Sequence, residues 1–186
     1  MNATMPGRGR IGEGRAAGWN MPTDIIELDA QLRLPWDLTQ WVGKPRLLEW
    51  IDEEVARLNW SNPELTAHLL THPEFQPRRL LKLLTTAYLT AVFESEDIVD
   101  RCYSDATLRS ICGPQAAPQR QTIARFRRDN RGLLRWLMEQ VLTRAMRTHF
   151  DVETGRLPAG LKRYLHEDAT ERLEVARHMD RAAQGA

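Results

Sequence analysis

The residues of this chain best suited to chemistry form one short run of arginine, glutamine and threonine. They are Gln119, Arg120, Gln121, Thr122, Arg125, Arg127, Arg128 and Arg131. Arginine and glutamine side chains can each make paired hydrogen bonds to guanine and adenine edges, and arginine also binds phosphate oxygens. Because phosphate contacts usually form the majority in such interfaces, we expect some of these side chains to bind the DNA backbone. The run predicts binding of double-stranded DNA.

Histidine and cysteine offer weaker patterns. His68 and His72 are four residues apart, which suits a metal on one helix face, but Pro73 follows directly and a third ligand is not evident. Cys102 and Cys112 each fall inside a predicted helix and form no CxxC pair, so we interpret them as small buried residues. The sequence predicts no metal or other cofactor, and a small metal-dependent nuclease is the least favoured function.

The elements around the arginine-rich run predict a helix-turn-helix. Asp105 can cap one helix, which Gly113 and Pro114 end, and a short linker leads to a second helix from about residue 119. Ile123 and Phe126 should face inward on that second helix. Arg120, Gln121, Ala124, Arg127 and Arg128 are then expected on its opposite face, with Thr122 and Arg125 at the flanks. This geometry places a second helix in the DNA major groove, but similar shapes recur in unrelated proteins.

The rest of the chain also predicts helices. The pattern from Leu47 to Leu58 is amphipathic, with Glu49, Asp52, Glu53 and Glu54 expected outside. Residues 80–93 are apolar on nearly every face, as in a central core helix, and Ser95 should cap a shorter helix after it. A break at Asp129 and Asn130 precedes a long helix, and a mostly polar helix is expected over 167–183. Its thin apolar edge would be Leu173, Ala176 and Met179. The fold class is all-α: a compact bundle containing a helix-turn-helix.

Charge and composition set the domain organisation. Residues 101–149 hold ten basic and three acidic side chains, so the excess positive charge is local although the net charge is +1. We expect a disordered tail over 1–22, a helical DNA-binding domain over 23–150, and a loop with a peripheral C-terminal helix over 151–186. Residues 80–93 are too few and too polar for a bilayer span of ~20 residues, and a signal peptide is not evident, which favours the cytoplasm and no membrane partner.

A longer stretch of the sequence resembles a known family. The segments are Leu80–Leu84, Tyr88–Leu89 and Ser95–Ile98, then Tyr103, Asp105, Arg109 and Gly113 in a Y-D-x-x-x-R-x-x-x-G run, and Thr122–Arg128, where Ala124 replaces the usual serine of T-I-S-R-F-R-R. This order is similar to the N-terminal, DNA-binding domain of bacterial insertion-sequence DDE transposases. The resemblance spans about residues 30–150.

The resemblance implies binding to the terminal inverted repeats of a mobile element during DNA transposition. It also implies an RNase H-like catalytic domain with three carboxylates, which the residues after Phe150 are too few to build. Asp151 lies near the family's first catalytic strand, but the nearby Gly155 and Pro158 argue against a strand. We therefore expect a DNA-binding transposase derivative that is not an enzyme, acting as a homo-oligomer or with a separately encoded catalytic domain. The alternative is a helical interaction or regulatory module that has lost DNA binding.

Overall fold

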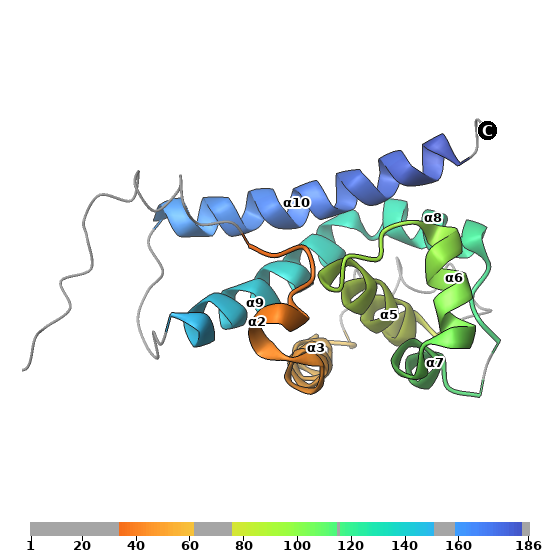
Figure 1. Cartoon of the computed structure of the whole chain (residues 1–186), viewed down its shortest axis with the longest axis horizontal. Coiled ribbons are helices and arrows are strands. Elements are labelled where there is room, and N and C mark those ends of the chain that lie inside the picture. The colour runs from red at the N-terminus through yellow and green to blue at the C-terminus, as the bar shows by residue number, and fades with distance from the viewer. Residues whose placement is uncertain (1–33, 62–75, 115, 151–158, 184–186) are drawn as a thin grey trace, which may run out of the picture.

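The computed structural model of the protein describes residues 34–61, 76–114, 116–150 and 159–183 (Figure 1). These residues form eight helices: α2 (Thr39–Val42), α3 (Lys44–Arg57), α5 (Pro77–Leu89), α6 (Ser95–Ser104), α7 (Ala106–Cys112), α8 (Arg120–Asp129), α9 (Arg131–His149) and α10 (Ala159–Ala182). Beside them the described ranges contain only an isolated antiparallel bridge between Asp37 and Thr90. The predicted all-α class is confirmed. The predicted tail over 1–22 and the pair His68 and His72 lie outside the described residues.

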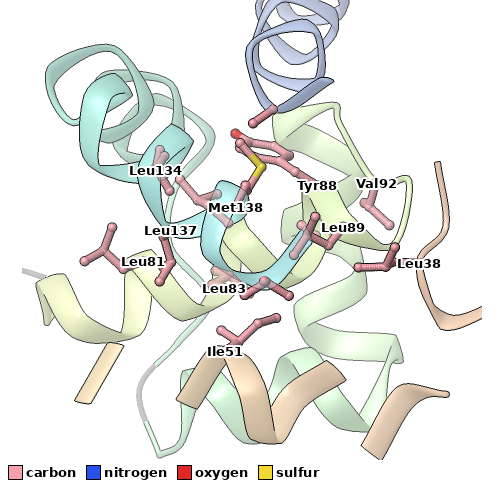
Figure 2. Packing of buried hydrophobic residues seen from close by; sticks show 14 of the residues in the cluster. Leu38, Ile51, Leu81, Leu83, Tyr88, Leu89, Val92, Leu134, Leu137 and Met138 are labelled. Atoms are coloured by element: carbon pink, nitrogen blue, oxygen red, sulfur yellow. The ribbon is translucent and has the colours of Figure 1, made fainter. Parts of the chain in front are cut away.

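Helix α5 lies at the centre of the bundle because it is apolar on nearly every face. From Leu80 to Leu89 every residue except Lys82 is buried, and α5 contacts α3, α7, α8, α9 and α10. Figure 2 shows its side chains packed among those of α3 and α9, including Ile51, Leu83, Leu137 and Met138. The central helix was predicted to reach residue 93, but it ends at Leu89, because Ala91 has a φ of 58° and leaves the right-handed helical region.

Helix α3 carries the predicted apolar stripe and a buried acid that the prediction placed outside. Its buried apolar side chains are Leu47, Trp50, Ile51 and Val55. Glu54 is only 4 % exposed. It accepts hydrogen bonds from Arg57 at 2.6 Å and from Arg144 of α9 at 3.2 Å. A carboxylate is buried only when charge and hydrogen bonds compensate it, and these two guanidinium groups do so. The expectation of an exposed Glu54 is therefore wrong.

Helix α7 begins and ends at the residues predicted for it. The Asp105 carboxylate accepts hydrogen bonds from the backbone N–H groups of Thr107 at 2.7 Å and Leu108 at 3.0 Å. At the other end Gly113 has a φ of 67°, which favours glycine. Arg79 of α5 donates to the carbonyl of Cys112 at 2.9 Å and so satisfies one of the last carbonyl groups of α7. The cap and the stop are confirmed.

Helix α10 is longer and better integrated than the peripheral helix predicted over 167–183. It begins at Ala159 and runs along α9 towards α8 (Figure 1). Its buried apolar side chains, Leu165, Ala169, Leu173 and Ala176, belong to the same core cluster as those of α5 and α9. Met179, predicted on the apolar edge, is 43 % exposed. Within the described ranges, each helix is too short or too polar to cross a membrane.

Arg172 anchors the middle of α10 to the rest of the bundle. Its side chain is fully buried. The guanidinium donates to the carbonyl oxygens of Trp36 at 2.7 Å, Tyr88 at 2.9 Å and Pro35 at 2.8 Å, and to the Asp168 carboxylate at 2.7 Å. A buried charge with these partners fixes the position of α10 against α5 and against the segment that precedes α2.

Candidate nucleic-acid interface

Helix α8 divides the predicted DNA-binding residues between solvent and core. Its buried residues are Ile123, Phe126 and Arg127. Five of the eight predicted residues are exposed: Gln119, Gln121, Arg125 and Arg128 on or beside α8, and Arg131 at the start of α9. Arg120 and Thr122 are half-buried. The inward pair Ile123 and Phe126 is confirmed, and the break between α8 and α9 falls at Asn130 as predicted.

Arg127 does not face solvent, and the prediction that it does is wrong. The residue is 6 % exposed and its guanidinium forms an ion pair with Asp180 of α10. It also donates a hydrogen bond to the Tyr88 hydroxyl at 3.2 Å. Ile123, Phe126 and Arg127 follow the i, i+3, i+4 spacing of one helix face, so the same geometry that buries the two apolar side chains also buries this arginine.

Asp180 joins three helices in the buried network around Arg127. Besides the ion pair, its carboxylate accepts hydrogen bonds from the Ser95 backbone N–H at 2.8 Å and from the Ser95 hydroxyl at 2.6 Å. Ser95 was predicted to cap α6 with its own side chain, but it is the first residue of that helix. The carboxylate of α10 satisfies its N–H instead, at the end of α6 that favours negative charge.

The pKa values of this network follow from burial and from the neighbouring charges. Burial alone would raise the pKa of Asp180, but the hydrogen bonds from Ser95 and the attraction of Arg127 leave it below its ordinary value. Burial raises the pKa of Tyr88 to about 12, although Arg127 acts in the opposite direction. At neutral pH the network therefore holds an ionised aspartate, a charged arginine and a neutral phenol.

The exposed arginines of α8 and α9 form a surface track with acidic neighbours. Arg128 has a side chain 73 % exposed and lies 3.1 Å from Asp129, and Arg125 lies 3.6 Å from the same carboxylate. Arg131 forms an ion pair with Glu174 of α10. Exposed pairs of this kind contribute little to stability, because water and salt screen them.

A cleft of about 470 Å³ opens between this track and α10. Its walls carry three arginines of α8 and α9, namely Arg127, Arg128 and Arg131, and two of α10, Arg177 and Arg181. The sequence reasoning missed the two arginines of α10 and the carboxylate of Asp180. The sequence could have predicted the inward position of Asp180, because it follows Leu165, Ala169, Leu173 and Ala176 at helical spacing and so lies on the same face.

The packing of α7 and α8 does not by itself identify the predicted helix-turn-helix. Helix α7 contacts α5 and α6, whereas α8 contacts α5, α6, α9 and α10. Gly113 and the residues after it connect α7 to α8 as expected. The assignment of α8 as a recognition helix stays a prediction.

The remaining chemistry-bearing residues have structural surroundings. Cys102 and Cys112 are buried free thiols, and the interaction with Cys112 together with burial raises the pKa of Cys102. The His149 ring stacks on Trp41 at a centroid distance of 3.9 Å, and His166 lies 2.8 Å from Glu139. In the part of the chain that the structure describes, three potential metal ligands do not come together anywhere. Asp151 lies outside that part.

The fold and the site define an all-helical domain in which arginines of α8, α9 and the end of α10 line one cleft. A protein family described as Transposase domain (DUF772) matches residues 37–129, which is half of the 186 residues. The chain belongs to this transposase domain family. The match begins just before α2 and ends at the last residue of α8. Neither the comparison with curated proteins nor that with solved structures gave a significant match.

Proposed function

We propose that this transposase-family protein binds double-stranded DNA through the exposed polar surface of α8 and the start of α9. The observation that carries the proposal is the track of Arg125, Arg128 and Arg131, three exposed guanidinium groups on two consecutive helices. Gln121 is exposed on the same helix and supplies a side chain suited to an adenine edge. The buried Arg127 holds α8 in place and is not part of the contact surface.

Membership of the transposase domain family supports DNA of element ends as the natural target. Base contacts by Gln121 and its neighbours would give preference for one sequence, whereas the arginines would bind any duplex through phosphates. A fluorescence anisotropy titration therefore compares a duplex carrying an inverted repeat, sought in the DNA beside the coding sequence, with a scrambled duplex of equal length. Each titration is repeated at several salt concentrations. The slope of the logarithm of affinity against the logarithm of salt concentration, here called the salt slope, reports the number of phosphate contacts.

The decisive variant is Arg128→Ala, because Arg128 is exposed and contributes nothing to the core. It should weaken binding to both duplexes and reduce the salt slope by the amount that corresponds to about one phosphate contact. Arg163→Ala is the matched control, since Arg163 is 75 % exposed on the distant end of α10 and its loss removes the same charge. If the unaltered protein fails to bind either duplex at low salt, the proposal is wrong, and the helical interaction or regulatory module becomes the better hypothesis.

We further propose that this chain binds DNA without cutting it, by itself or as a homo-oligomer. Incubation of bound duplex with Mg²⁺ or Mn²⁺, followed by denaturing electrophoresis, tests this directly. Specific strand cleavage by the pure protein would overturn it. The same cleavage appearing only when a second, separately encoded chain is added would support a shared assembly.

A further inference from the structure

The cleft between α8, α9 and α10 brings together arginine side chains from three helices. Five arginine side chains line it, against the two carboxylates of Glu174 and Asp180. The Asp180 carboxylate is already engaged with Arg127 and Ser95 in the core. Arg128 pairs with Asp129 beside the cleft, so Glu174 is the cleft-lining carboxylate left beside Arg131, Arg177 and Arg181.

The Glu174 carboxylate of α10 connects the two walls of the cleft, which are α10 on one side and α8 with α9 on the other. One of its carboxylate oxygens pairs with Arg131 of α9, and the other lies 2.5 Å from Arg177 of α10. An anion of similar size and charge bound at this point would meet the same guanidinium groups. Arg181, one turn further along α10, is exposed and has no carboxylate partner within the described ranges.

The wall formed by α10 is held in place by buried interactions, so Arg177 and Arg181 do not lie on a loose helix end. Arg172 and Asp180 fix α10 by buried charges at two points, eight residues apart. Arg177 lies between these anchors and Arg181 directly follows the second. Their backbone positions are therefore defined relative to α8 and α9, as a preorganised binding site requires.

We propose that this cleft binds a backbone phosphate of duplex DNA, with Arg177 and Arg181 contributing contacts from α10 beside those of Arg128 and Arg131. The inference rests on the proposed function and extends it to a helix outside the segment that matches the transposase family. In the free protein Glu174 stands in for the phosphate, and DNA displaces it. The DNA-binding surface is then formed from both sides of the cleft.

Two variants with opposite expected effects test this on the full chain. The double variant Arg177→Ala, Arg181→Ala should weaken binding of a 30-base-pair duplex about tenfold and lower the salt slope by nearly two contacts. Glu174→Gln removes the competing carboxylate and should tighten binding about fivefold. The double variant Lys162→Ala, Arg163→Ala is the matched control for the first, because it also removes two positive charges from exposed residues of α10 away from the cleft. Glu171→Gln is the matched control for Glu174→Gln, because Glu171 is exposed on α10 and does not line the cleft.

The outcomes separate the two proposals. Weaker binding by the double variant together with tighter binding by Glu174→Gln, each beyond its control, supports the phosphate site. If Arg128→Ala weakens binding but both cleft variants match their controls, the DNA-binding proposal stands and this inference is wrong. If the unaltered protein binds no duplex at low salt, both are wrong. Unchanged circular dichroism and thermal unfolding of the cleft variants would establish that they fold.

Discussion

Replacing Asp180 by asparagine should destabilise this protein far more than a single aspartate normally does. The substitution keeps the shape of the side chain but leaves the Arg127 guanidinium, 6 % exposed, without its counter-charge. Removing one partner of a buried ion pair costs about 3–5 kcal/mol, a large part of the roughly 5–15 kcal/mol that a domain has. For a chain of this length the midpoint of thermal unfolding should fall by roughly 10 °C.

Urea unfolding, monitored by the circular dichroism signal of the helices, measures this change. Asp100→Asn is the control, because Asp100 is exposed on α6. The pKa of Asp180 is lower in the folded protein than in the unfolded chain, so its stabilisation is present at neutral pH and is lost as the pH falls through the folded value. The gap between Asp180→Asn and the unaltered protein should therefore narrow in acid. A loss below 1 kcal/mol at pH 7, or a gap independent of pH, would refute the reasoning.

Three further changes probe the same fold. Gly113→Ala should cost about 1–3 kcal/mol, because φ is 67° and the added Cβ would lie 2.9 Å from the Arg79 guanidinium; urea unfolding would show it. Asp105→Ala removes the cap of α7 and should cost about 1 kcal/mol, with Asp105→Asn recovering part of it. In an ultraviolet titration, Tyr88 should ionise only near pH 12, and stability should fall as the pH rises from about 10 through that value, an effect absent from Tyr88→Phe.

The predictions that succeeded depended on signals confined to a few neighbouring residues. Asp105 caps the helix that begins beside it, Gly113 stops the same helix, and Asn130 marks the break between α8 and α9. Each acts on backbone groups within about one turn of itself, so its effect can be read from the local sequence. The apolar residues 80–89 likewise predict a core helix, because no orientation of that helix would expose only polar side chains.

The predictions that failed concerned charged or polar residues whose partners lie far away in the chain. Arg127 is buried by a carboxylate 53 residues later, and Glu54 by an arginine 90 residues later. In both cases the helical spacing favoured burial, but the charge was taken as evidence of exposure. Periodicity identifies the face on which a residue lies, whereas the partner that permits burial of its charge becomes visible only in the tertiary structure.

The same long-range pairs indicate that the arginine-rich surface cannot be separated from α10. A chain ending at residue 150 would retain Arg127 and Ser95 but lose Asp180, at about 3–5 kcal/mol. It would also lose the buried side chains of Leu165 and Leu173, each contributing about 1.5–3 kcal/mol. Together these losses approach the whole stability of a typical domain. We expect the shortened chain to lack a cooperative unfolding transition and to bind no duplex, although it contains the whole segment that matches the transposase family. A shortened chain that unfolds cooperatively and binds DNA like the full one would show that α10 is dispensable, and the cleft could then not be part of the DNA-binding surface.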